Sequence, residues 1–233
     1  MNSKEYALIV AGGKGTRIKS KTPKQFLELN GLPVLMHTIL AFYRYSEKIS
    51  IILVLPEDDM ATWKSLCKQY NFRHNPTLQK GGETRFQSVK NGLEKIEGDG
   101  LVAIHDGVRP LVNTEIIATS FRVAAVNDTA IAAVSLKESL RITNENATKA
   151  VDRSNFKLIQ TPQTFKVSLI KKAYESAEDS SLTDDASVAE KAGYSISLFE
   201  GSYENIKITT AEDLVVAEAL LKLRQHSVTG IKK

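Results

Sequence analysis

Residues 8–27 read LIVAGGKGTRIKSKTPKQFL, an apolar run that breaks into a glycine-rich loop and then becomes basic. A strand followed by such a loop suggests phosphate binding, but this loop fits neither of the two common templates. A P-loop requires GxxxxGK[ST], whereas Gly15 is followed here by Thr16 and Arg17. The dinucleotide fingerprint GxGxxG has Ile18 where its third glycine belongs. The stretch therefore predicts a phosphate site of another kind.

The chemistry of this loop favours a ligand with several phosphate groups. Gly12, Gly13 and Gly15 would let backbone N–H groups approach a phosphate without a Cβ in the way. Arg17 and Lys24 can neutralise more than one phosphate, the arginine as a fork and the lysine as a point charge. The alternative is a plain strand-to-helix turn with solvated basic residues. The two flanking cations make phosphate binding the better interpretation.

The rest of the chain alternates strands with helices. Apolar runs typical of buried strands lie at 6–11, 49–55, 101–105 and 130–134, and helical spacing is found at 34–45, 59–70, 84–96 and 114–126. Strands that are apolar throughout indicate a sheet covered on both faces. We therefore predict an α/β fold: a Rossmann-like, doubly wound, mostly parallel sheet flanked by helices. Such a fold binds ligands outside the carboxyl ends of its strands, where the glycine loop lies.

The pattern changes between about residues 135 and 163. Short strand-like pieces at 140–143, 149–151 and 157–160 alternate with polar turns, which predicts an antiparallel β-arm too small to bury its own core. The regular pattern then returns, with helices at 167–177 and 184–191, strands at 194–199 and 206–208, and a helix from its N-cap Thr210 to Arg224. We predict one domain over residues 1–225, including the arm, and a polar tail over 226–233.

The composition excludes several classes of protein. The chain has 233 residues, of which 42% are hydrophobic and 25% charged, with a formal net charge of +4. Because the charge is mild and the basic residues are spread out, we expect no nucleic-acid partner. No apolar run approaches the roughly 20 residues of a membrane span, so no membrane partner is expected. The single cysteine, Cys67, allows no internal disulfide. We expect a cytoplasmic protein.

Two further motifs point to the same edge of the sheet. In GGETRFQSV (81–89) a glycine pair opens a helix whose free N–H groups suit polar ligand edges, although ordinary capping explains Glu83 and Thr84 equally well. In HDGVRP (105–110), Asp106 at the end of a buried strand is typical of a metal or sugar-hydroxyl ligand. A structural salt bridge with Arg109 is the alternative. We favour the functional interpretation and expect His105 to orient its neighbours.

Later positions add cations rather than a nucleophile. Lys207 lies in an apolar strand pattern, where a buried lysine needs an anionic partner. Capping is the default explanation for Thr183 and Asp184. Cys67 lies in a helical segment with no histidine nearby in sequence. Glycine turns, dispersed cations and one carboxylate suit phosphoryl or nucleotidyl transfer, where the protein positions groups and stabilises charge.

Eight stretches together resemble the 2-C-methyl-D-erythritol 4-phosphate cytidylyltransferases of isoprenoid biosynthesis. They are AGGKGTR (11–17), PKQFL (23–27), GGETRFQSVKNGL (81–93), HDGVRP (105–110), VDR (151–153), QTPQTF (160–165), TDDAS (183–187) and NIKIT (205–209). The resemblance covers nearly the whole chain, from about Tyr6 to Leu223. Each stretch alone is modest evidence, whereas eight in order at similar spacing are highly specific.

The resemblance implies transfer of CMP from CTP to 2-C-methyl-D-erythritol 4-phosphate, with release of pyrophosphate and a need for Mg²⁺ or another divalent cation. Nucleotide contacts would come from Ala11, Gly12, Gly13, Gly15, Gly82, Glu83, Ser88, Asp106 and Gly107. Sugar-phosphate contacts would come from Asp106, Arg109, Ser139, Arg153, Thr161, Thr183 and Lys207. Arg17, Lys24 and Lys207 would act in catalysis, and Asp106 would lie near the metal.

Electrostatics supports these roles, because one phosphate must attack another. Two unit charges about 4 Å apart interact by about 4 kcal/mol at an effective dielectric near 20. We therefore expect Lys24 and Lys207 to stabilise the transition state, and Arg109 and Arg153 to bind substrate. In the family that this chain resembles, the arm reaches into the neighbouring subunit. The resemblance thus implies a homodimer with arm exchange, in which Arg153 and Thr161 could act in trans.

The sequence departs from the family pattern at two places and leaves alternatives open. The family usually has AAG where this chain has Ala11–Gly12–Gly13, and DT followed by a lysine where this chain has Glu138, Ser139 and Arg141. The nearest alternative is a ribitol-5-phosphate cytidylyltransferase, although SVKNGL, VDR and TDDAS favour the methylerythritol enzyme. A sugar-nucleotide pyrophosphorylase and a non-catalytic nucleotide-sensing module are the more distant ones.

Overall fold

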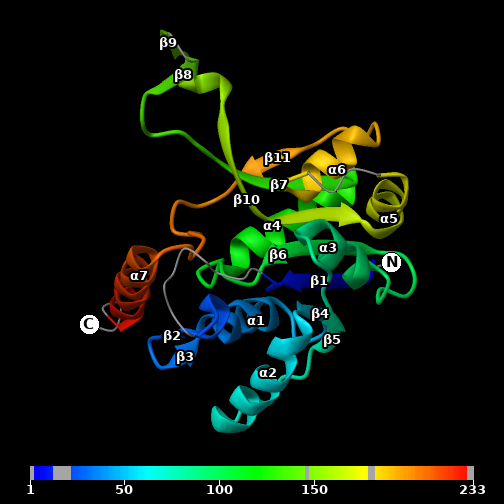
Figure 1. Cartoon of the computed structure of the whole chain (residues 1–233), viewed down its shortest axis with the longest axis vertical. Helices are drawn as coiled ribbons and strands as arrows, with labels where there is room; N and C mark the ends of the chain where they lie inside the picture. Colours follow the sequence, from blue (N-terminus) through cyan, green and yellow to red (C-terminus); the bar gives the residue numbers. More distant parts are fainter. Residues whose placement is uncertain (1–2, 13–21, 145–146, 178–181, 230–233) are drawn as a thin grey trace.

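The computed structural model describes residues 3–12, 22–144, 147–177 and 182–229, with side chains up to residue 224 (Figure 1). The expected loop residues Gly13, Gly15 and Arg17 lie outside these ranges. Within the described ranges, no helix is both long enough and apolar enough to cross a membrane.

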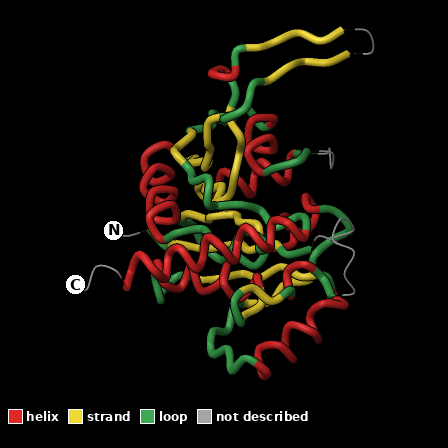
Figure 2. The backbone as a smooth tube through the Cα atoms, turned by 90° about the vertical axis from the view of Figure 1, so that its left-hand side faces the viewer, coloured by secondary structure: helices red, strands yellow, loops and turns green. Residues whose placement is uncertain are grey.

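A seven-stranded sheet runs through the centre of the molecule, with helices on both faces (Figures 1 and 2). Its strands, in spatial order, are β11 (Leu198–Glu200), β7 (Thr129–Ser135), β10 (Lys157–Lys166), β6 (Leu101–Asp106), β1 (Glu5–Val10), β4 (Ser50–Leu55) and β5 (Thr77–Lys80). Neighbouring strands are parallel, except that β10 is antiparallel to both β6 and β7. The predicted doubly wound, mostly parallel sheet is confirmed.

Side chains of β1 show why both faces of the sheet carry helices. The helices are α1 (Val34–Tyr45), α2 (Glu57–Gln69), α3 (Arg85–Leu93), α4 (Thr114–Asn127), α5 (Val167–Ser176), α6 (Asp185–Lys191) and α7 (Ala211–Thr229), with 3₁₀ turns η1 (Lys24–Phe26) and η2 (Arg153–Asn155). Successive residues of a strand face opposite sides. Ala7 and Ile9 pack in one core with α1 and α4, whereas Leu8 and Val10 pack in another with α3 and α5.

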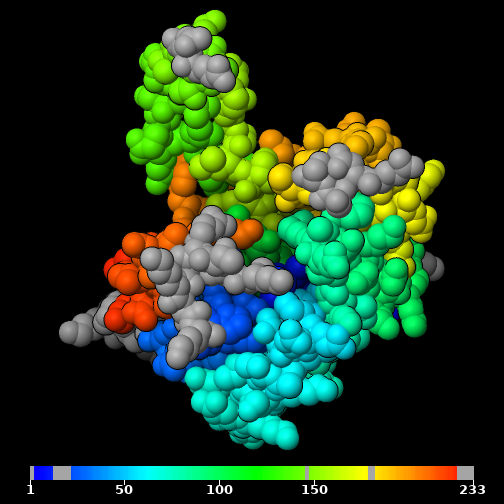
Figure 3. Space-filling view, viewed as in Figure 1, coloured from blue at the N-terminus to red at the C-terminus, as the bar shows by residue number. Residues whose placement is uncertain are grey.

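The arm is shorter than the predicted 135–163. Its two strands, β8 (Leu140–Asn144) and β9 (Ala147–Val151), form a separate antiparallel pair that stands away from the body (Figures 1 and 3). Residues 157–166, by contrast, belong to the central sheet as β10. The prediction was wrong here because β10 is rich in polar residues: Gln160, Thr161 and Gln163 are buried, yet each has hydrogen-bond partners inside the protein.

Two strands and one chain end also differ from the prediction. The strand at 194–199 is reduced to β11, because the Thr129 hydroxyl donates to the Ser195 carbonyl and accepts from the Ser197 N–H in place of a ladder. Residues 206–208 form no strand; the Ile208 N–H donates to the Val108 carbonyl. Helix α7 extends into the predicted tail as far as Thr229, since 211–229 contains neither glycine nor proline.

Three short strands were not predicted at all. No residue of strand β5 (Thr77–Lys80) is buried, so its sequence lacks the apolar pattern of an inner strand. A short hairpin of β2 (Glu28–Leu29) and β3 (Leu32–Pro33) turns at Asn30 and Gly31, both with positive φ. This hairpin follows η1 and leads directly into α1, so it fixes the segment that carries Lys24.

Candidate active site

A first cavity of about 630 Å³ lies at the carboxyl ends of β1, β4 and β6. Of the residues expected to contact the nucleotide or to act in catalysis, it brings together Ala11, Gly12, Lys24, Gly82, Glu83, Ser88, Asp106 and Lys207. Parallel strands place their carboxyl ends at one edge, so segments far apart in sequence meet here.

A second cavity of about 420 Å³ lies beside the first, against β10 and the start of α6. It collects five of the residues expected to contact the sugar phosphate, namely Asp106, Arg109, Thr161, Thr183 and Lys207. Arg85, Asp106 and Lys207 line both cavities and therefore mark their border.

Asp106 is buried at this border and faces three cations. Lys207 Nζ lies 3.0 Å and Arg109 Nε 3.2 Å from its Oδ2, while Arg85 Nε lies 3.8 Å from its Oδ1. Burial alone would raise the pKa of Asp106, but Lys207, Arg85 and Arg109 lower it well below its usual range. The carboxylate is thus ionised at neutral pH, and the cations around it exceed its charge. The salt bridge between Asp106 and Arg109, which was the alternative interpretation of this motif, does form. The contacts of Asp106 with Lys207 and Arg85 form as well.

A chain of hydrogen bonds holds Asp106 and Arg109 in place. The Thr161 hydroxyl accepts from the Asp106 N–H at 3.1 Å and lies 3.1 Å from His105 Nδ1, to which it donates. His105 Nε2 in turn donates to the Arg109 carbonyl at 3.2 Å. Burial lowers the pKa of His105 to about 4, so its ring is neutral near pH 7. Thr161 therefore lies in the site of its own chain.

The glycine pair at 81–82 is held by the helix that follows it. Thr84 caps α3 by accepting from the Gln87 N–H, as the capping interpretation predicts. The Gly82 N–H donates to Ser88 Oγ at 3.1 Å, which holds the loop at the cavity wall. A Cβ added to Gly82 would lie 2.3 Å from Gln87 Cβ, so only glycine fits.

The departure at Gly12 is compatible with the site. A Cβ at Gly12 would meet Ser88 Oγ at 3.6 Å, an ordinary contact, so the alanine usual in the family would also fit. Gly107 differs, because a Cβ there would lie 2.8 Å from Ala11 Cβ. Gly107 does not line either cavity; its N–H donates to the Val10 carbonyl and its carbonyl accepts from Thr38, so it joins β1, β6 and α1.

A partly buried ion pair next to this site was not predicted from the sequence. Arg85 Nη1 and Nη2 donate to Oδ1 and Oδ2 of Asp185 at 2.9 and 2.7 Å, and Tyr174 Oη donates to the same carboxylate at 2.6 Å. Both residues occur in stretches that the resemblance uses, but they are 100 positions apart. Only the tertiary fold brings them together, since α5 packs against both α3 and α6.

Two expected substrate residues lie away from both cavities. Ser139 and Arg153 are exposed near the base of the arm, and Arg153 donates to the Lys137 carbonyl. The arm stands out from the body, so these side chains do not reach the cavities of their own chain (Figure 1).

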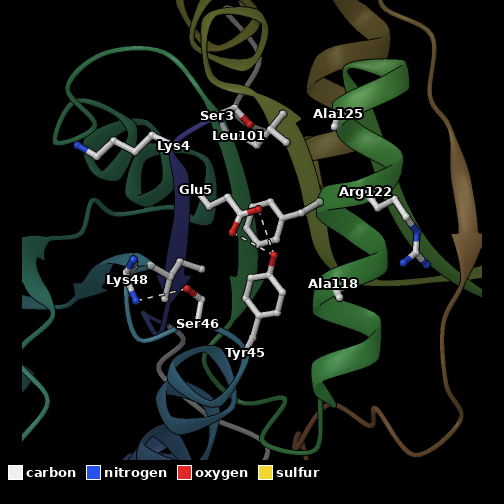
Figure 4. Close-up of a pocket in the computed structure, with 12 residues that line it drawn as sticks. Ser3, Lys4, Glu5, Tyr45, Ser46, Lys48, Leu101, Ala118, Arg122 and Ala125 are labelled. Carbon is white, nitrogen blue, oxygen red and sulfur yellow. Dashed lines mark hydrogen bonds between the residues drawn. The ribbon is translucent and has the colours of Figure 1, made fainter. Parts of the chain in front are cut away.

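A larger hollow of about 750 Å³ lies at the opposite edge of the sheet, where β1 and β6 begin (Figure 4). Tyr45 Oη donates to both oxygens of Glu5, at 3.0 and 3.1 Å, whereas Lys4 and Arg122 point away from Glu5 (Figure 4). No expected site residue that the structure describes lines this hollow, and its charged groups do not converge.

The comparison with protein families decides between the alternatives. The family model of 2-C-methyl-D-erythritol 4-phosphate cytidylyltransferase matches residues 6–223. This chain belongs to that family. The enzyme of that name from Bacteroides fragilis is 51% identical over 215 residues, 92% of this chain and 98% of the relative. The one from Phocaeicola vulgatus is 47% identical over 216 residues, 93% and 99% of the two chains.

Solved structures agree with the family assignment. A 4-diphosphocytidyl-2C-methyl-D-erythritol synthase from Anaerococcus prevotii superposes with a TM-score of 0.80 at 30% identity, covering 94% of this chain and 99% of its own. A 2-C-methyl-D-erythritol 4-phosphate cytidylyltransferase from Francisella tularensis gives 0.76 at 30% identity, covering 92% and 98%. The predicted family and the predicted cytidylyltransferase activity are confirmed, and ribitol 5-phosphate is not favoured as the acceptor.

Proposed function

We propose that the first cavity binds CTP and the second binds 2-C-methyl-D-erythritol 4-phosphate, which the chain joins into 4-diphosphocytidyl-2-C-methyl-D-erythritol for non-mevalonate isoprenoid biosynthesis. The observation that carries this proposal is the shared border of the two cavities at Asp106, Arg85 and Lys207. A phosphate bound in one cavity meets a phosphate bound in the other at that border. We further propose that the reaction takes place in the cytoplasm.

In the proposed reaction, a phosphate oxygen of the sugar phosphate attacks the α-phosphorus of CTP. A new P–O bond forms, the bond from the α-phosphorus to the bridging oxygen of the β-phosphate breaks, and pyrophosphate leaves. Lys207 at the border and Lys24 in the first cavity would offset the charge that builds up on the α-phosphate. Arg17 would assist them from the glycine loop. Arg109 and Thr183 would bind the acceptor phosphate from the second cavity.

The residues at the border fit a magnesium ion bound mainly through the triphosphate. Within the described residues, no three His, Cys, Asp or Glu side chains form a metal cluster of their own. Magnesium in nucleotide sites takes one or two carboxylates and otherwise phosphate oxygens and water. Asp106 Oδ1 would supply that carboxylate, since its contact with Arg85 at 3.8 Å is beyond hydrogen-bond distance. When bound, the ion would neutralise phosphate charge.

We propose that the working enzyme is a homodimer with exchanged arms. The arm and the base of β10 expose the apolar side chains of Ile142, Phe156, Leu158 and Ile159. Exposed apolar side chains gathered in one region are typical of an interface. Exchange of arms would bring Arg153 and Ser139 of each chain towards the second cavity of its partner. Thr161 would act within its own chain.

The decisive experiment measures pyrophosphate release from CTP and Mg²⁺ with a panel of polyol phosphates. We expect turnover with 2-C-methyl-D-erythritol 4-phosphate, a kcat/KM at least about 100-fold lower with ribitol 5-phosphate, and loss of activity on chelation that Mg²⁺ restores. Equal or faster turnover of ribitol 5-phosphate would overturn the proposed acceptor. A preference for UTP or GTP would point to a sugar-nucleotide pyrophosphorylase, and CTP binding without pyrophosphate release to a sensing module.

A further inference from the structure

Arg85 occupies an unusual place in this fold. It is the first residue of α3, its side chain is 27% exposed, and it lines both cavities. A cation in such a place would ordinarily be assigned to substrate binding. Its two terminal nitrogens, however, are both hydrogen-bonded to Asp185, whose side chain is fully buried.

The partner of Arg85 begins the helix that forms a wall of the second cavity. Asp185 is the first residue of α6, and the residues just before it, Thr183 and Asp184, line that cavity. A bidentate arginine–carboxylate pair fixes both distance and orientation, unlike a pair made by lysine. The pair therefore fixes where the wall that carries Thr183 stands relative to α3.

Further contacts make this joint stiff. Tyr174 of α5 donates to Asp185 at 2.6 Å, and its ring stacks on Phe86 of α3 at 4.7 Å between centroids. From the sheet side, Gln163 donates to Asp184 at 3.0 Å and accepts from the Ala186 N–H at 2.8 Å. Two other helices, α3 and α5, and one strand, β10, thus converge on the first turn of α6.

The same arginine also faces the nucleotide side. Its Nε lies 3.8 Å from Asp106 Oδ1, so one guanidinium stands between the carboxylate at the cavity border and the carboxylate that starts α6. Burial alone would lower the pKa of Arg85, but Asp185 and then Asp106 raise it above its ordinary range. Arg85 is therefore a permanent cation within this arrangement.

We propose that Arg85 is a positioning residue. Its bidentate pair with Asp185 keeps the wall of the second cavity in a fixed position relative to Asp106, which aligns the acceptor phosphate with the nucleotide. The inference rests on the proposed function for the identity of the two ligands. Arg85 acts through Asp185 and α6 rather than by binding the acceptor itself.

Arg85→Lys and Asp185→Asn test this role with little change in size. The lysine keeps the charge but cannot form the fork, and the asparagine keeps the shape but loses the charge. We expect each variant to raise the KM for the sugar phosphate by about tenfold or more, with the KM for CTP changed by less than about threefold. Because the two residues act as a unit, the double variant should be no worse than the more severe single variant.

Arg122→Lys is the matched control. Arg122 lies on α4, pairs with Glu115 at 3.7 Å and lines neither cavity, so its kinetic constants should match those of the wild type. Amide hydrogen exchange gives a second measurement that needs no substrate. Peptides over residues 182–191 should exchange faster in Arg85→Lys than in the wild type, while those over α7 should not change.

The outcomes separate the possibilities. Unchanged exchange at 182–191 would show that the pair does not hold the start of α6. A lower melting temperature with unchanged kinetic constants would show an ordinary stabilising ion pair. Either result would overturn the inference. A KM increase confined to CTP would show a direct nucleotide contact and overturn it too. If the wild type itself releases no pyrophosphate, the proposed function fails, and hydrogen exchange still decides whether Arg85 positions α6.

Discussion

At the scale of single residues, the site is organised around one buried carboxylate. Asp106 ends β6, and Lys207 and Arg109 contact one of its oxygens while Arg85 faces the other. A buried carboxylate is stable only when it is paired, and here the pairing cations are more numerous than the charge requires. The excess positive charge is what an anionic substrate would meet at the border of the two cavities.

Lys24→Ala and Lys207→Ala should separate transition-state stabilisation from binding. If both lysines act on the α-phosphate during transfer, each substitution should lower kcat by about 10²- to 10³-fold and change KM much less. Steady-state kinetics with CTP and the sugar phosphate measures both constants. Lys171→Ala is the control, because Lys171 donates to the Ile96 carbonyl and lines neither cavity. A raised KM at unchanged kcat would show that the lysines only bind substrate.

At the scale of elements, short connections place the reactive side chains. The β2–β3 hairpin links η1, which carries Lys24, to α1. His37 of α1 is buried, and its Nε2 donates to the Leu29 carbonyl at 2.6 Å, which ties the hairpin to the helix. Strand β10 works in the same way: its antiparallel pairing with β6 brings Thr161 to the Asp106 backbone.

The contact of His37 predicts a pH dependence of stability. Burial lowers the pKa of His37 below its ordinary value of 6.5, so the folded state takes up its proton only at lower pH than the unfolded state. The stabilisation is therefore complete above about pH 6.5 and is lost as the pH falls towards the folded pKa, by at most about 1.4 kcal/mol per pH unit. Urea unfolding between pH 7.5 and pH 5.5 should show a larger loss in the wild type than in His37→Gln. Parallel curves would contradict the prediction.

At the scale of the whole molecule, the arm leaves the fold with unpaired apolar surface. The β8–β9 pair makes a sheet of only two strands, which is marginally stable alone. Ile142 on the arm is 57% exposed, and Leu158 at the base of β10 is 51% exposed. In the proposed homodimer, a second copy of the chain would cover these side chains and would deliver Arg153 to the second cavity.

Ile142→Lys and Leu158→Lys test the proposed dimer. A charge at a buried apolar contact is strongly unfavourable, so analytical ultracentrifugation should give the mass of two chains for the wild type and of one chain for the variants. Turnover of the sugar phosphate should fall with the dimer fraction. Val126→Lys is the control: Val126 is 82% exposed on α4 and should leave the mass unchanged. A wild type that sediments as one chain, yet is fully active, would contradict the proposed exchange of arms.

Much of the site could be predicted from the sequence, and particular residues show where prediction stopped. Asp106, Arg109 and Lys207 were singled out from their motifs and lie together. Asp106 ends β6 and Arg109 follows it, whereas Lys207 comes beside them through the bond from the Ile208 N–H to the Val108 carbonyl. Only residues 157–160 of strand β10 were predicted as a strand, because its buried glutamines and threonines resemble the polar residues of a loop. The pair of Arg85 and Asp185 was not predicted, because neither residue carries a local signal for a partner 100 positions away.

The α/β class, the order of most elements, the family and the residue types at the site can all be read from the amino-acid sequence. These follow from local periodicity and from motifs, which depend on neighbouring residues only. The packed fold adds that Asp106 faces three cations, that two cavities share one border, and that Arg85 joins that border to α6. Those facts depend on the packing of helices and strands distant in sequence, and no local pattern encodes the distances between them.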